Sequence, residues 1–170
     1  RKLGMKKGAY FMGLLNEMNH TIAQYKDLGE VRDFAGDVQK AVNTLSEMGL
    51  FLATCSREGK FLIPLGNAYP FLMMMGKVVA GWLLLWQAGV ARTRLEELAK
   101  AQGVDQGDSA TWAKFVRANR DAAFYAGKIY SARFFAKNVL PEVDAAAAAI
   151  RNEDLSIMEI PDESFASFMI

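Results

Sequence analysis

The chain is poor in the side chains that most catalytic and metal sites need. Its 170 residues include a single histidine, His20, and a single cysteine, Cys55. One cysteine cannot form an internal disulfide, and the two residues together provide neither a Cys-x-x-Cys motif nor a Cys/His dyad at useful spacing. A glycine loop ending in Gly-Lys-Ser/Thr, which would bind phosphates, is also missing. The sequence therefore predicts no catalytic or cofactor-binding residues in this chain.

A carboxylate-bridged metal site is the one metal centre for which a fragment of the pattern exists. Glu17 and His20 form a Glu-x-x-His pair on an expected helix. Ferritin-like sites use one such pair from each of two helices, together with further glutamates. Because His20 has no second histidine to match it, we expect both side chains to be ordinary surface groups and the chain to hold no metal.

Excess charge of either sign is also missing. The 20 lysines and arginines nearly balance the 19 aspartates and glutamates, which leaves a net charge of +1. This balance gives no electrostatic reason to expect nucleic acid or an anionic membrane as a partner. The lone Cys55, the nine methionines and the absence of a recognisable signal peptide favour a reduced, cytoplasmic protein. The chain begins with Arg1, so we expect it to be part of a longer one.

Helical periodicity is what the sequence has in abundance. Apolar residues recur at three- and four-residue steps in an expected first helix that ends near residue 28, with Gly29 in the left-handed conformation, and in a second over residues 31–52. Residues 57–70 read as a loop, and a long third helix follows over residues 71–100. A fourth helix begins near residue 111, where Asp108 or Ser109 can accept hydrogen bonds from its first free amides. The prediction is one all-α domain, residues 1–170, an antiparallel four-helix bundle with long third and fourth helices and a short docked C-terminal tail.

The third helix is apolar enough to raise the alternative of a membrane span. Residues 71–91 contain only Lys77 and Gln87 as clearly polar side chains, and about 20 mostly apolar residues suffice to cross a bilayer. The amphipathic helices around it, however, need an apolar partner. A helix buried in the centre of a soluble bundle accounts for both facts, and it is the interpretation we favour.

The expected fourth helix carries the most distinctive stretch, residues 121–144. One stripe of it is suited to packing, while its charged side chains fall off that stripe, and Pro141 should end or kink the helix about one turn before itself. The closing residues 157–170 are too apolar for a free tail and should dock on this bundle, on a second copy or on the rest of a longer protein. The candidate packing and interface residues are Tyr125, Lys128, Ile129, Arg133, Phe135, Pro141, Phe165 and Phe168.

These residues also carry a resemblance. Residues 124–142 follow the pattern FYxGKxxxARFFxxxVLPE, which resembles the last long helix of the C-terminal helical domain of bacterial acyl-CoA dehydrogenases of the methylmercaptopropionyl-CoA type. Residues 76–82, GKVVAGW, resemble the preceding helix of that domain. The opening RKL and the closing IPDESF at residues 160–165 resemble its two ends.

The resemblance implies a function for a parent enzyme rather than for this chain. Such enzymes use FAD to remove hydrogens from the α and β carbons of an acyl-CoA, with a glutamate in a Tyr-Glu-Gly-Thr segment as the base. That segment would lie upstream of Arg1, so the chain alone is expected to have no activity. Its implied partners are the catalytic core of the parent and other copies of itself. The alternatives are a free-standing helical interaction module and a membrane-associated helical domain.

Overall fold

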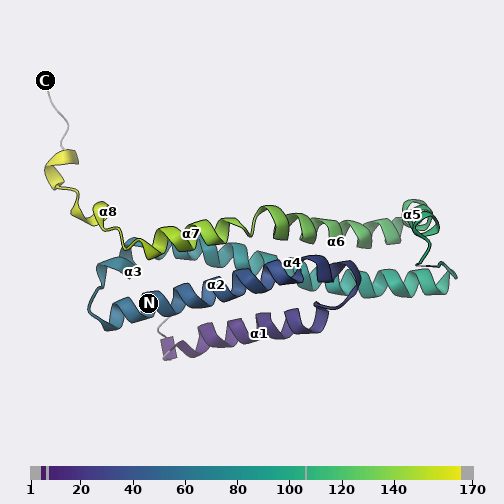
Figure 1. The fold of residues 1–170 in the computed structure, drawn as a ribbon, viewed down its shortest axis with the longest axis horizontal. Coiled ribbons are helices and arrows are strands. Elements are labelled where there is room, and N and C mark those ends of the chain that lie inside the picture. The colour runs from purple at the N-terminus through teal and green to yellow at the C-terminus, as the bar shows by residue number, and fades with distance from the viewer. Residues whose placement is uncertain (1–4, 7, 106, 166–170) are drawn as a thin grey trace, which may run out of the picture.

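The structure is a computed structural model that describes residues 5–6, 8–105 and 107–165, and every regular element in these ranges is helical. Four long helices lie side by side: α1 (Ala9–Tyr25), α2 (Arg32–Arg57), α4 (Ala68–Ala101) and α6 (Arg120–Asn138) (Figure 1). The shorter elements are η2 (Gly29–Val31), α3 (Leu62–Gly66), α5 (Ser109–Ala118), α7 (Glu142–Arg151), α8 (Ser156–Glu159) and η3 (Asp162–Phe165). The all-α prediction is confirmed.

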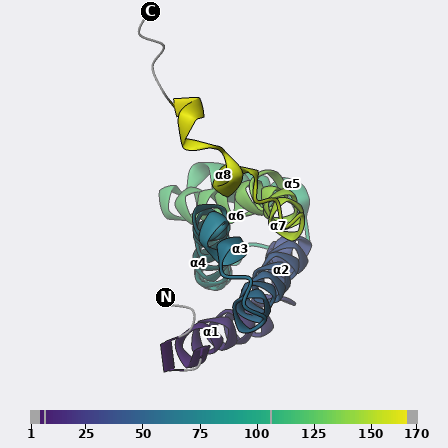
Figure 2. The same cartoon turned by 90° about the vertical axis from the view of Figure 1, so that its left-hand side faces the viewer.

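Helix α4 lies at the centre of the arrangement. It contacts α1 and α2 on one side and α6 and α7 on the other (Figure 2). Near the start of α4, the rings of Phe11 and Phe71 lie 6.3 Å apart, so α1 begins beside this end. Helix α6 runs the opposite way, because its C-terminal end brings Leu140 against Gly81. The chain of α6 and α7 therefore covers one side of α4 along most of its length.

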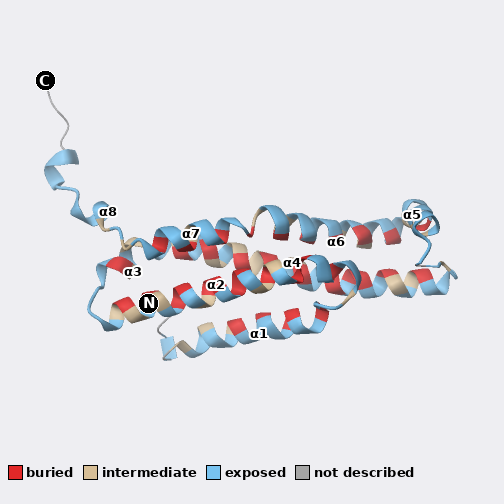
Figure 3. Ribbon diagram, viewed as in Figure 1, coloured by how far each residue is buried: buried red, intermediate tan, exposed pale blue. Residues whose placement is uncertain are grey.

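Small residues line the contact between α4 and α6. Buried alanines recur along α6 at helical spacing, and they face a side of α4 that is also rich in small residues. Small side chains let helix axes approach closely, which favours extensive van der Waals contact. Figure 3 shows buried residues as red bands along both helices. The residues concerned are Gly81, Ala88 and Ala91 on α4, and Ala122, Ala126, Ala132 and Ala136 on α6.

The first predicted boundaries need small corrections. Helix α1 ends at Tyr25, three residues before the expected end, and Gly29 has the predicted positive φ of 45° but opens η2 instead of capping α1. The predicted loop over residues 57–70 contains α3, and α4 already starts at Ala68. Pro70 is tolerated there because amides in the first turn of a helix have no intrahelical partner.

The prediction of a single long fourth helix is wrong. Asn119 breaks it into α5 and α6: its backbone is extended, with φ −111° and ψ 118°, and its side-chain oxygen accepts hydrogen bonds at 3.0 Å from the amides of Asp121 and Ala122. This is an N-cap, which satisfies amides that a continuous helix would have used internally. The predicted effect of Pro141 is confirmed, since α6 ends at Asn138 and α7 begins at Glu142.

The described part of the C-terminal tail does not pack along the bundle, which leaves a second copy or the rest of a longer protein as the other docking partners that the sequence predicts. Helix α8 contacts α3, near Gly66, and the chain then leads away from the helices (Figure 1). Phe165 is 73% exposed. Phe168 lies outside the described residues. Apolar composition signals that a segment needs a partner, but not which molecule supplies it.

Candidate functional site

The candidate residues on α6 divide between packing and surface positions. Ile129 is buried, and Tyr125 and Phe135 are half-buried against the core. Lys128 places its ammonium group 5.2 Å from the centre of the Phe124 ring, where the ring face attracts a cation. Arg133 is exposed. The helix thus has one packing stripe and one polar, aromatic outer side.

A buried arginine, Arg92, anchors one end of the bundle. Arg92 of α4 pairs with Glu30 of η2 at 2.7 Å and with Glu96, one turn further along α4, at 3.1 Å. Its guanidinium carbon also lies 5.6 Å from the centre of the Trp112 ring on α5. A planar guanidinium can pair with carboxylates and stack on an aromatic ring at the same time, so Arg92 ties three elements together. The only sequence signal was the i, i+4 spacing to Glu96.

A cavity of about 330 Å³ opens beside this cluster, between α4, α5 and α6. Its floor is apolar, and Arg117 and Arg133 stand exposed on its rim. Glu30, its one carboxylate, is already paired with Arg92. The lining residues are Glu30, Leu95, Trp112, Ala113, Val116, Arg117, Ala126, Ile129, Tyr130 and Arg133.

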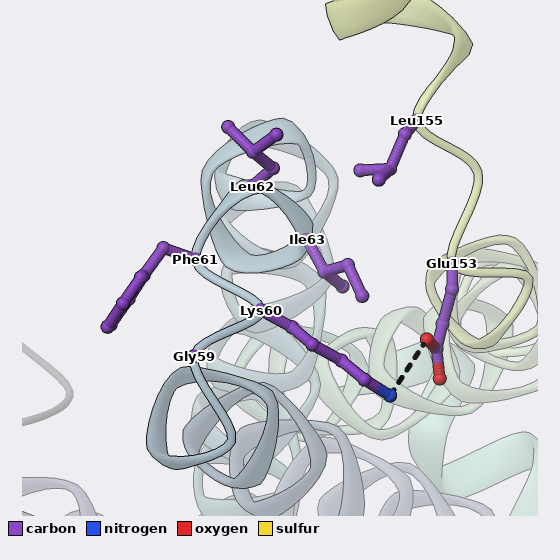
Figure 4. A pocket seen from close by; sticks show the side chains of 7 residues that line it. All are labelled: Gly59, Lys60, Phe61, Leu62, Ile63, Glu153 and Leu155. Atoms are coloured by element: carbon purple, nitrogen blue, oxygen red, sulfur yellow. Dashed lines mark hydrogen bonds and ion pairs between the residues drawn. The ribbon is translucent and has the colours of Figure 1, made fainter.

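A second hollow of similar size lies where the α2–α3 turn meets the end of α7. Figure 4 shows Lys60 reaching across it to Glu153, at 3.4 Å, while Phe61 points away. The charge of Glu153 raises the pKa of Lys60, so the ammonium group of Lys60 stays charged and pairs with the carboxylate. The hollow is therefore bridged by a surface ion pair and contains no group poised for proton transfer or nucleophilic attack.

The two residues of the metal-site fragment lie at the surface of the bundle. Glu17 and His20 are both exposed on α1. Within residues 5–6, 8–105 and 107–165, no group of three or more histidine, cysteine or acidic side chains is placed to hold a metal ion. Cys55 is buried and packs as a small apolar side chain.

The most unusual feature of the molecule is a side of α4 that no other helix covers within the part of the chain that the structure describes. Large apolar side chains are exposed along it for about two thirds of the helix, and the positions alternate by three and four residues. We call this surface the α4 outer face. It consists of the exposed residues Tyr69, Leu72, Gly76, Leu83, Trp86 and Val90 and the half-buried Val79, with Met73 beside it.

Charge is scarce on this helix between Tyr69 and Val90. Lys77 is the only charged residue in the stretch, and its ammonium group pairs with Glu142 of α7, on the side that the bundle covers. On α6, by contrast, the exposed aromatic residues Phe124 and Phe134 alternate with charged ones such as Lys128.

Helix α4 is central, as predicted, but it is not buried all round. By length and composition it meets the criterion for crossing a membrane, and only 28% of the 18-residue window that meets the criterion is buried in the bundle. The prediction of a fully buried helix is therefore wrong for the outer face. Periodicity could not reveal this, because a helix that is apolar on every side gives no sign of which side its neighbours leave open.

The fold and these surfaces define a helical packing domain, one with its internal charges paired and one long apolar face uncovered. Comparison of the sequence with known families gives a match to the family described as acetyl-CoA dehydrogenase C-terminal like, over residues 14–161. The chain belongs to this family. The resemblance that the α6 pattern indicated is thereby confirmed.

Individual relatives agree with the family match. A butyryl-CoA dehydrogenase of Syntrophomonas wolfei is 30% identical over 166 residues, which cover 96% of this chain and 24% of the relative. The broad-specificity linear acyl-CoA dehydrogenase FadE5 of Mycobacterium tuberculosis is 26% identical over 170 residues, which cover 97% of this chain and 25% of the relative. The chain thus spans about a quarter of the length of the relatives it matches.

Proposed function

We propose that this chain is the accessory C-terminal domain of an FAD-dependent acyl-CoA dehydrogenase, in which it packs against the catalytic part and supplies no reacting group. The family match carries this proposal, because it covers residues 14–161 while the matched dehydrogenases are about four times as long as the chain. A cytoplasmic location is part of the same proposal.

The chemistry of the parent is an α,β-dehydrogenation of an acyl-CoA. A carboxylate base takes the α-proton, and FAD, when bound, accepts the β-hydrogen as hydride. The residues described here do not fit FAD. The two cavities, of about 330 Å³ each, are at the small end for ligand sites, and neither has a glycine-rich loop at the start of a helix to receive a pyrophosphate. We therefore assign FAD and the base to the rest of the parent chain.

On this proposal the domain contributes packing contacts to the parent enzyme. Its ion pairs, such as Arg151 with Glu47 at 2.8 Å and Lys137 with Asp37 at 2.8 Å, hold α6 and α7 on α2 at exposed positions, where each pair stabilises the fold only modestly. The apolar α4 outer face is left for contacts outside the domain. A free-standing interaction module would use the same face, but it would not be encoded behind a dehydrogenase core.

The test compares the full-length parent with the chain of residues 1–170 alone. We expect the parent to bind flavin stoichiometrically, seen in its visible absorption, and to oxidise an acyl-CoA. The chain alone should be helical and colourless. Stoichiometric flavin on the isolated chain, or a parent that neither binds flavin nor oxidises acyl-CoA, would overturn the proposal.

A further inference from the structure

We infer that the α4 outer face is the surface on which this domain docks against a helix of the catalytic part that precedes it in the parent chain. This inference rests on the proposed function and goes beyond it, because it names the surface and the kind of structure that covers it.

The spacing of the residues on this face indicates a helical partner. Tyr69, Leu72, Gly76, Val79, Leu83, Trp86 and Val90 follow one another at steps of three, four, three, four, three and four residues. An apolar seam with a mean step of 3.5 residues is what a helix presents to a second helix that lies along it at a small crossing angle. A partner helix about as long as the seam would cover all of it.

Gly76 adds to this geometry. It is exposed within the seam, and a Cβ atom added to it would meet no atom within 4 Å. Gly76 stabilises nothing inside the bundle, and glycine in a helix interior is unfavourable. A missing side chain in the seam lets the backbone of a partner helix approach closely. The glycine is thus explained by a contact outside the domain.

The point at which the preceding part of the parent chain joins this domain favours that part as the structure that covers the α4 outer face. The family is a C-terminal one by its description, so the additional length of the relatives lies largely before the matched region. That preceding chain reaches this domain at the start of α1. Phe11, in the first turn of α1, contacts Phe71 at the start of α4, next to Tyr69 and Leu72. The α4 outer face is therefore within direct reach of the segment that enters.

The charges around the face do not suit a membrane surface. Helices that lie on membranes border their apolar side with lysines and arginines that remain available for lipid phosphates. Here Lys77 is paired with Glu142, and Arg94, beyond the apolar stretch, is paired with Glu97 at 2.8 Å. A membrane is therefore an outcome for the experiment to detect and not the occupant we infer.

The test measures whether this face is covered in the full-length parent. Leu72→Cys reports on the α4 outer face, and Phe124→Cys on α6 is a matched control. Leu72 and Phe124 are each the fifth residue of their helix and are 62% and 59% exposed in this domain. The native Cys55 is buried and should react slowly. The measured quantity is the rate of maleimide labelling of each cysteine, resolved by peptide mass spectrometry on the flavin-containing parent.

We expect the cysteine at position 72 to react at least about tenfold more slowly than the one at position 124, because labelling then requires the docked face to open. Equal rates would overturn the inference. Protection that disappears on dilution, in step with a fall in molecular mass, would assign the face to a second copy of the chain. Protection that appears only with phospholipid vesicles would assign it to a membrane. Each of these two results also overturns the inference.

The labelling result can be interpreted separately from the test of the proposed function. Flavin content and acyl-CoA oxidation are measured on the same preparations. A parent that contains flavin and oxidises acyl-CoA, but labels equally at both positions, contradicts the docking surface alone. A parent without flavin contradicts the proposed function, whatever the labelling rates.

Discussion

The inner and outer sides of α4 are both lined by apolar residues, yet only the inner side is packed. On the inner side, Leu85 is fully buried and Gly89 lies against the ring of Tyr25. On the outer side, Leu72 and Trp86 are exposed. A monomeric protein gains stability from burying such side chains and loses nothing by replacing exposed ones with polar residues. The difference teaches that the outer side is not explained by the stability of this domain and needs a partner to account for it.

The largest difference between the two sides should appear on truncation of one leucine from each. Leu85→Ala should lower the free energy of unfolding by about 2 to 5 kcal/mol, because it leaves a cavity at a fully buried site. Leu72→Ala, at an exposed site, should change it by less than about 0.5 kcal/mol. Urea denaturation of the chain measures both. Similar losses for the two variants would show that the outer side is packed within the domain.

A second pair extends the comparison to α6, which covers the inner side of α4. Ile129→Ala should cost about 2 to 5 kcal/mol, since Ile129 is buried. Phe135 is half-buried, so Phe135→Ala should cost about 1 to 2 kcal/mol, scaled from the value for full burial. Chemical denaturation again gives the values. No loss for Ile129→Ala would contradict the packing of α6 on α4.

The two glycines on opposite sides of α4 should respond to alanine with opposite signs. A Cβ at Gly89 would lie 2.4 Å from ring atoms of the buried Tyr25, so Gly89→Ala should destabilise by about 1 to 3 kcal/mol. Gly76→Ala meets open space and should stabilise by about 0.5 to 1 kcal/mol through helix propensity. Thermal unfolding of the two variants gives the signs. Destabilisation by Gly76→Ala in the isolated chain would mean that the outer face is already occupied.

The smallest expected effect concerns a polar contact, remote from either side of α4. Hydrogen bonds from the Thr111 hydroxyl and the Ala110 amide lower the pKa of Asp108, which caps α5. A carboxyl with a lowered folded-state pKa stabilises the fold above its unfolded value of 3.8 and loses that contribution as the pH falls below it.

The control for this cap is Asp108→Asn, which keeps a capping side chain but cannot titrate. Urea midpoints of both proteins, measured from pH 7 down to pH 3, should show the advantage of the native protein shrinking as the pH falls through this range. A constant difference between the two proteins would refute the role of the charged cap.

Local chemistry made several features of the fold predictable. Pro141 cannot donate an amide hydrogen bond, and Asp108 can accept one from the first turn of a helix, so each marked a helix boundary correctly. Asn119 carried the same kind of signal as Asp108. It was missed because the apolar periodicity continues across it. A periodic pattern does not show where one residue ends a helix and caps the next.

The candidate site was less predictable, because it depends on where the neighbouring helices lie. The sequence shows that the third helix is apolar all round, but the uncovered side is defined only once α1, α2 and α6 have taken their places. Arg92 is a similar case: its partners Glu30 and Trp112 are distant in sequence. The tail around Phe165 is a further example, since its apolar composition predicted a contact but did not identify the partner.

The central claim is that the α4 outer face is covered in the parent enzyme, and one measurement on the unmodified protein tests it most directly. Tyr69 on this face and Tyr130 on α6 are the same residue type and are 70% and 67% exposed in this domain. Hydroxyl-radical footprinting of the full-length parent compares their rates of oxidation. We predict that Tyr69 is oxidised several-fold more slowly than Tyr130, because covered side chains are shielded from solvent. Equal rates at the two tyrosines would contradict the account.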